Sequence, residues 1–239
     1  MEIDPLSDAK IIDSWNKNAT PWTTAVRTGQ IESRLLSTDQ AIVDAVLTRS
    51  PRSVLDIGCG EGWLARVLEA KGIRVTGVDV VPGLIEEAQG AGAGTFHAVS
   101  YEEIAAGKLQ ISVDVIVCNF ALLGKESVEG LFGAIPSLLN PHGSFVFQTL
   151  HPVAACGDYP YQDGWRGGSW EGFASEFTDP APWYFRTLGS WVTLVIENRL
   201  RLLELREPLH MKTKQPASVI FIAAPTPIQS APAACRCGE

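Results

Sequence analysis

The sequence predicts an α/β fold, in which a mostly parallel sheet carries helices on both faces. Short apolar segments alternate with segments of helical periodicity between residues 53 and 150, which is the pattern of consecutive β-α-β units. A glycine-rich break, GCGEG, follows the first apolar segment directly. Two more strand-like segments, residues 202–206 and 218–223, come near the end of the chain.

The expected strands are short apolar runs bounded by glycine, proline or polar residues. A parallel strand is covered by helices on both faces, so it reads as a nearly continuous apolar run. Those in the alternating region are expected at residues 53–57, 74–81, 95–99, 113–120 and 144–150.

The expected helices follow from apolar spacing and from residues that start or stop a helix. Residues 63–71 have apolar side chains at helical spacing, and Gly72 ends that segment. Pro82 suits the first turn of a helix over residues 84–89. Further helices are expected at residues 39–49, 127–139 and 188–198.

The composition limits the possible functions. The 239 residues are 46% hydrophobic and 19% charged, with a formal net charge of −8. We find no dense Lys/Arg cluster, which argues against a nucleic-acid partner. No apolar run reaches the roughly 18 residues needed to span a bilayer, and MEIDPLSDAK has no apolar signal-peptide core. A cytoplasmic protein without a membrane span is therefore expected.

The five cysteines do not predict a disulfide framework or a metal site. Cys59 lies in the glycine loop and Cys118 in a hydrophobic strand, and both are expected to behave as small buried apolar residues. Cys235 and Cys237 form a CxC near the end of the chain. Two thiolates alone do not complete a zinc site, so we expect residues 225–239 to be a flexible tail without a metal.

The glycine loop, residues 58–62, differs from the common phosphate-binding motifs. A dinucleotide fingerprint has a glycine three positions after its second one, where helix and strand pack closely. That position is Trp63, and no Gly-Lys-Ser/Thr of a P-loop follows. Asp56 and Glu61 make the loop a poor site for a polyanion and favour a cationic ligand without phosphate. Asp79, 21 residues after Gly58, suits the hydroxyls of a ribose.

Three motifs together resemble the class I S-adenosylmethionine (SAM)-dependent methyltransferases, particularly those of ubiquinone and menaquinone biosynthesis. They are VLDIGCGEG, VTGVDVVPGLIEEA and VDVIVCNFALL. The resemblance is good over residues 40–150 and implies a Rossmann-like, seven-stranded sheet whose last strand is antiparallel. It implies a helical lid at residues 1–50, a SAM-binding domain at residues 51–224, and S-adenosylhomocysteine (SAH) as product.

The resemblance also implies cofactor-binding residues. Gly58, Cys59 and Gly60 would lie against the methionine part of SAM, and Asp56 would help to hold its amino end. Arg34 is favoured over Arg27 as the cation for the SAM carboxylate. Asp79 would bind the ribose, Val80 would pack on the adenine, and Asn119 and Phe120 would lie near the methyl group. Ser100 stands where the family commonly has an aspartate that binds the adenine amino group. The backbone N–H of Tyr101, the next residue, could bind the adenine ring instead.

The acceptor is expected to bind under residues 151–191, which we call the cover. This segment holds 10 of the 20 aromatic residues and an excess of acids, which disfavours an anionic substrate. His151, at the end of a strand, is the candidate general base; a loop-anchoring role is the alternative. Candidate substrate-pocket residues are Trp22, Tyr159, Tyr161, Trp165, Trp170, Trp183 and Tyr184.

The sequence therefore predicts a SAM-dependent methyltransferase that acts on a small, aromatic or apolar molecule by in-line transfer. Three alternatives remain open. The same fold could transfer another SAM-derived group, or it could bind SAM without catalysis. An NAD-linked dehydrogenase is disfavoured by Trp63 and by the acids of the loop.

Overall fold

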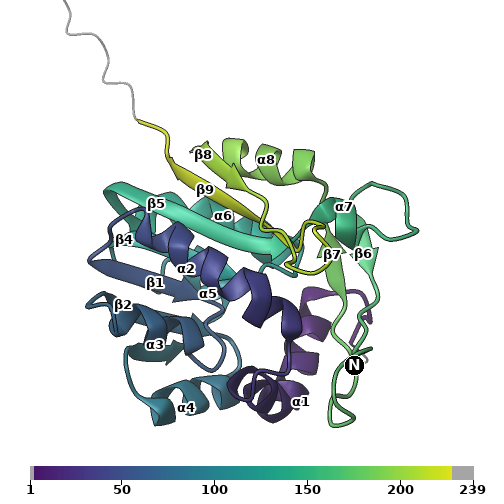
Figure 1. Ribbon diagram of the computed structural model, residues 1–239. Coiled ribbons are helices and arrows are strands. Elements are labelled where there is room, and N and C mark those ends of the chain that lie inside the picture. Colours follow the sequence, from purple (N-terminus) through teal and green to yellow (C-terminus); the bar gives the residue numbers. More distant parts are fainter. Residues whose placement is uncertain (1–2, 228–239) are drawn as a thin grey trace, which may run out of the picture.

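The computed structural model describes residues 3–227 and contains the predicted seven-stranded sheet (Figure 1). The strand order is β3-β2-β1-β4-β5-β9-β8. β1 to β5 pair in parallel, and β9 pairs antiparallel with β5 on one side and β8 on the other. The predicted Rossmann-like fold with its last strand antiparallel is thus confirmed. The bounds are β1 Ser53–Ile57, β2 Arg74–Asp79, β3 Thr95–Ala98, β4 Val113–Asn119, β5 Leu139–Leu150, β8 Leu200–Arg206 and β9 Ser218–Pro225.

Helices cover both faces of the sheet because alternate strand residues point to opposite sides. On one face, Val54, Val115 and Val146 pack with side chains of α2, α3 and α4. On the other face, Leu55 and Ile116 pack with side chains of α5, α6 and α8. The helix bounds are α2 Asp39–Leu47, α3 Trp63–Glu69, α4 Pro82–Ala91, α5 Tyr101–Ala105, α6 Glu126–Leu138 and α8 Leu188–Glu197.

An aromatic cluster holds α6 and α8 on β5 and β9. Phe147 of β5 stacks on Phe221 of β9 with ring centroids 4.6 Å apart. Phe132 of α6 and Trp191 of α8 lie 5.4 Å from the Phe147 ring. Burial of such rings is a large apolar contribution to folding, so the carboxyl end of β5 rests on a rigid base.

The lid and the cover meet at the carboxyl edge of the parallel strands (Figure 1). Of residues 1–50, which were expected to form the lid, α1 (Asp8–Arg27) and a π-helical turn at Arg34–Thr38 lie at this edge. α2 packs on the sheet face instead, so from here the lid means residues 3–38. The cover contains α7 (Pro152–Ala155) and a small two-stranded sheet of β6 (Gly164–Arg166) and β7 (Trp183–Phe185).

Several elements differ from the sequence-based expectation. β5 begins at Leu139 rather than residue 144, and the β6–β7 sheet was not predicted. Strands of three residues separated by a long loop leave no period-two signal to detect. Within residues 3–227 we find no helix with the length and apolarity to cross a membrane. Cys235 and Cys237 lie outside the described residues.

Candidate functional site

A cavity of about 490 Å³ lies at the carboxyl edge of the sheet, under the lid and the cover. This volume is within the usual range for small-molecule sites. Strand ends and the glycine loop form its floor, α1 and the turn after it form one wall, and β7 with the start of α8 forms another. The carboxyl ends of parallel strands are where α/β folds place their ligands.

The glycine loop is anchored to β2 by its backbone. The N–H groups of Gly58 and Cys59 donate to the carbonyl of Val78 at 2.8 and 3.0 Å. Gly58 has a φ of 73°, a region that other residues rarely adopt. A Cβ on Gly58 would also overlap the Cβ of Ala121. This position therefore requires glycine for two separate reasons.

Asp79 borders the cavity beside this loop. Its Oδ2 accepts from the Gly60 N–H at 3.0 Å, and its Oδ1 accepts from the Val81 N–H at 3.0 Å. Burial raises the pKa of Asp79, while these backbone donors act in the opposite direction. The carboxylate is thus held in one orientation at the end of β2, where ribose hydroxyls could donate to it.

In the structure the charge of Glu61 is balanced by two arginines, which differs from the sequence-based expectation. Its carboxylate is fully buried and forms ion pairs with Arg27 at 2.9 Å and Arg66 at 2.7 Å. The loop therefore carries no unbalanced charge from Glu61, and this part of the argument against a polyanion was wrong. Arg27 also binds Glu87 at 2.9 Å, so its guanidinium is already occupied by acids.

Of the two arginines considered for the SAM carboxylate, Arg34 is the one that lines the cavity. It is 9% exposed, and its Nε donates to Asp39 at 2.9 Å. Its guanidinium lies 4.7 Å from the Trp63 ring and 5.9 Å from the Trp22 ring. Its buried Nη2 has no hydrogen-bond partner in residues 3–227. A buried, unpaired donor is costly, so an anionic ligand group at this point would be stabilising.

The remaining expected cofactor residues, apart from Asp56, also line the cavity. Ser100 caps α5 by accepting from the Glu103 N–H at 3.2 Å, and the Tyr101 hydroxyl donates to the Ala121 carbonyl at 3.0 Å. Asn119 accepts from Gln148 at 2.7 Å. The cavity-lining members are Arg34, Gly58, Cys59, Gly60, Asp79, Val80, Ser100, Tyr101, Asn119 and Phe120.

Comparison with known proteins gives the same assignment as the motifs. A family model described as "Methyltransferase domain" matches residues 32–192. This chain belongs to the methyltransferase domain family. The prediction of a methyltransferase-type fold and family is therefore confirmed, and the match begins within the lid and ends within α8.

Individual relatives share less than a third of their aligned residues with this chain. The ubiquinone biosynthesis O-methyltransferase of Cupriavidus pinatubonensis is 28% identical over 62% of this chain and 61% of its own. A SAM-dependent methyltransferase from Mesorhizobium loti has a TM-score of 0.58 and 22% identity, over 75% of this chain and 95% of its own. Magnesium protoporphyrin IX methyltransferase from Synechocystis PCC 6803 has a TM-score of 0.63 and 18% identity, over 92% of this chain and 100% of its own. The chain thus spans about three fifths of that first curated relative.

Asp56 differs from its expected place in this methyltransferase domain. It does not line the cavity. It is 2% exposed, and its Oδ2 has no hydrogen-bond partner within the described chain. Burial, with a smaller contribution from Asp79, raises the pKa of Asp56 to about 7. Direct contact with a ligand amino group is therefore not supported; Asp56 lies beneath the loop.

His151 is a second correction. Its Nε2 lies 2.8 Å from Glu207, its ring is 4% exposed, and it does not line the cavity. This is the loop-anchoring alternative, because the contact ties the end of β5 to the segment after β8. The geometry gives no support to His151 as a general base.

The aromatic residues of the cover divide into two groups. Trp22, Trp170, Trp183 and Tyr184 line the cavity. Tyr159, Tyr161 and Trp165 do not, and the first two are 62% and 48% exposed. The cavity therefore gives no support to a substrate contact by these three residues.

The lid is fastened to the cover by residues that the sequence reading missed. Asn18 donates to the Thr178 carbonyl at 2.8 Å and accepts from the Thr178 N–H at 2.9 Å. Ser14 donates to the carbonyl of Asp179, whose carboxylate binds Lys10 and Lys17. Ser14 and Asn18 are fully buried. The sequence indicates their role only by placing polar residues on the buried face of α1.

The glycine loop yields a first prediction. Gly58→Ala should lower the free energy of unfolding by about 1–3 kcal/mol more than Gly72→Ala does. Both glycines have positive φ, but a Cβ on Gly72 meets nothing within 4 Å. The difference therefore isolates the overlap with Ala121. Urea denaturation measures it, and equal losses in the two variants would contradict the overlap.

Asp56 yields a pH prediction. A carboxyl whose pKa is raised on folding stabilises the protein fully at low pH and loses that contribution as pH rises through about 7. Between pH 5 and 7 the wild-type free energy of unfolding should therefore fall relative to Asp56→Asn, by at most about 1.4 kcal/mol per pH unit. Asp158→Asn, at an exposed acid, is the control. A wild-type minus Asp56→Asn difference that stays constant with pH would refute the assignment.

Proposed function

We propose that this chain transfers a methyl group from SAM to a small molecule that has an aromatic or apolar body. The observation that carries the proposal is the pair of charged groups at one cavity. Asp79 offers a fixed carboxylate, and Arg34 offers a buried guanidinium nitrogen that has no partner among residues 3–227. Family membership and the fold support the proposal, whereas the acceptor is inferred from the cavity walls.

The residues present fit SAM. Asp79 would accept from the ribose hydroxyls, and Arg34 would bind the carboxylate of the methionine part. The positive φ at Gly58 and Gly60 brings the loop backbone to the cavity without side chains. Asp79, rather than Glu61, supplies the negative potential at the cavity that favours a ligand carrying ammonium and sulfonium groups.

When bound, SAM supplies an electrophilic methyl group with a good leaving group. The protein's own residues then have to orient the acceptor and exclude water. Trp15, Trp22 and Trp170 line the cavity and are suited to exclude water. The Trp15 ring packs edge-to-face on Trp22 and on Trp170, with centroids 5.0 and 5.8 Å apart. The described cavity walls include no histidine, so the acceptor would arrive with an acidic or already nucleophilic atom.

The remainder of the cavity favours catalysis over simple SAM binding. It continues from the glycine loop past Asn119 and Phe120 to Trp183, Tyr184 and Trp191, which leaves room for a second molecule. Several curated relatives are named O-methyltransferases, including a ubiquinone biosynthesis enzyme and a malonyl-[acyl-carrier protein] enzyme. These names support oxygen as the accepting atom.

Calorimetry with SAM and SAH tests the proposal, and a lack of binding by both would overturn it. Asp79→Ala should weaken SAH binding by about five- to 150-fold, because removal of a hydrogen-bonding group from a ligand costs about 1–3 kcal/mol. Circular dichroism controls for folding, since Asp79 also binds the Gly60 N–H. Unchanged affinity in a folded variant would exclude the ribose contact.

A different pair of ligands tests Arg34. Arg34→Gln should weaken SAH by about tenfold or more, because it removes a charge-assisted hydrogen bond to the carboxylate. Methylthioadenosine lacks that carboxylate, so its affinity should stay nearly the same in Arg34→Gln and fall in Asp79→Ala. Equal losses of both ligands in Arg34→Gln would mean that Arg34 only supports the packing of Trp22 and Trp63.

A further inference from the structure

Arg186 is a second buried arginine at the cavity, on the side away from the ribose position. It directly follows β7, is 4% exposed and lines the cavity. Its guanidinium lies 4.8 Å from the Tyr184 ring and 5.1 Å from the Trp191 ring. Trp191 packs on Phe147 of β5, whereas Asp79 ends β2. Arg186 therefore belongs to the part of the cavity that is left for the acceptor.

The charge of Arg186 is incompletely compensated by the protein. Nη1 donates to the Gly124 carbonyl at 2.8 Å and Nη2 to the Lys125 carbonyl at 3.1 Å. The nearest carboxylate, that of half-exposed Glu129, is 3.7 Å from Nη2. No hydrogen bond from Nε is found within residues 3–227. Burial lowers the pKa of Arg186, which reflects the cost of a desolvated cation.

Two other acids near Arg186 are committed to backbone groups. Asp8, which also lines the cavity, accepts from the N–H groups of Lys125 and Ser127 at 2.8 and 2.7 Å. Asp163 accepts from the Thr187 N–H at 2.9 Å and from Ser190. Both oxygens of Asp8 and Oδ1 of Asp163 are bound by these donors, and neither acid lies within salt-bridge distance of Arg186 in the described chain.

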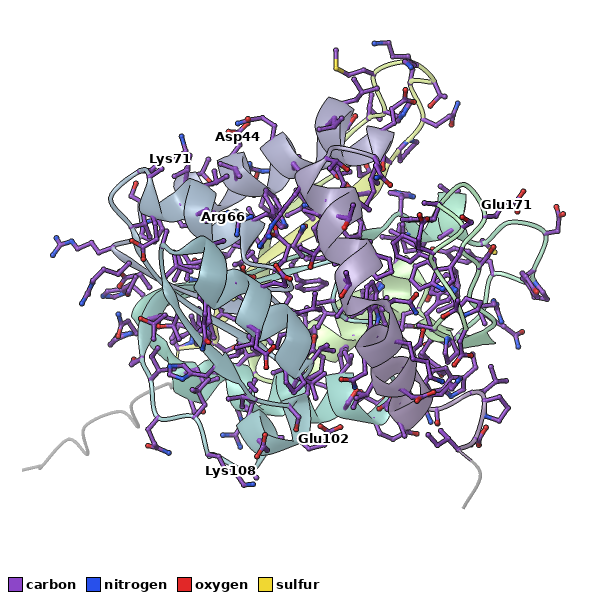
Figure 2. All side chains as sticks on the ribbon, turned by 90° about the horizontal axis from the view of Figure 1, so that it is seen from below. Asp44, Arg66, Lys71, Glu102, Lys108 and Glu171 are labelled. Carbon is purple, nitrogen blue, oxygen red and sulfur yellow. The ribbon has the colours of Figure 1, made fainter. Side chains whose placement is uncertain are left out.

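The acids of the cover do not oppose an anion in the cavity. Glu171 extends outward from the cover (Figure 2), and Asp158 and Glu176 are likewise exposed. Asp179 is bound by Lys10 and Lys17. None of these acids lines the cavity. The expectation that the acidic cover disfavours an anionic substrate therefore does not apply to the cavity.

We infer that the acceptor is a carboxylic acid with an aromatic or apolar body, and that its carboxylate binds Arg186. This inference rests on the proposed function. An arginine flanked by aromatic rings offers in-plane donors to a carboxylate and flat apolar faces to the body beside it. Both features are present, with Arg186 between Tyr184 and Trp191 and with Ile11, Ile12 and Trp15 also lining the cavity.

The test is calorimetry on the 239-residue chain saturated with SAH. The probes are acid and amide pairs of the same shape: benzoate with benzamide, 4-hydroxybenzoate with 4-hydroxybenzamide, and indole-3-acetate with indole-3-acetamide. In wild type at least one acid should bind about tenfold or more tightly than its amide, because hydrogen bonds to charged groups are the stronger ones. Arg186→Gln should remove this preference, and Lys125→Gln, at a nearby cation outside the cavity walls, should keep it.

The outcomes separate the two proposals. SAH binding without any acid preference in wild type would overturn the inference while leaving the proposed function intact. A lack of SAH binding would overturn the proposed function, and the inference with it. SAH affinity and melting temperature show whether Arg186→Gln folds. If Arg186→Gln does not fold, Arg186→Lys replaces it, because it keeps the charge and is expected to retain a reduced preference for the acid over the amide. The comparison of acid and amide binding in wild type can refute the inference without any variant.

Discussion

The hydrogen bonds between the glycine loop and the end of β2 are the constraint on which the site depends. Two loop N–H groups bind the Val78 carbonyl, and a third binds the Asp79 carboxylate. These bonds require β1 and β2 to be parallel and in register, with Ile57 opposite Val78. They also require a loop without side chains at Gly58, where Ala121 leaves no room. The floor of the cavity is thus a direct product of sheet register.

Charge around this floor is compensated unevenly. Glu61 is neutralised by two arginines, while buried Asp56 and half-buried Asp79 lack a cationic side chain at hydrogen-bond distance in the described chain. Arg34 and Arg186 line the same cavity from different sides with incomplete partners. Isolated buried charges are costly, so this pattern fits a site completed by a ligand that carries charges of both signs.

The sequence predicted the parts of the site that depend on neighbouring residues. Gly58, Gly60 and Asp79 follow strands whose apolar runs are plain, so their place at the sheet edge could be inferred. The sequence did not reveal pairings over long separations: Arg27 with Glu61 is 34 residues apart, His151 with Glu207 is 56, and Asn18 with Thr178 is 160. Such pairs leave no periodic signal, so the contact of His151 with Glu207 could not be inferred from the sequence.

The fastening of the lid to the cover bears on how ligands enter. Asn18 and Thr178 exchange two hydrogen bonds, and Trp15, Trp22 and Trp170 pack together beside them. Lid and cover therefore form one roof over the cavity, although about 160 residues separate them. Opening only one of them would break these bonds and expose the tryptophans to water, whereas movement of both together would keep them. The roof is also tied to the domain below it, because Arg27 of the lid pairs with Glu61 and Glu87. Arg186, which follows β7 of the cover, donates to the carbonyls of Gly124 and Lys125. Displacement of the whole roof would therefore break a second set of contacts.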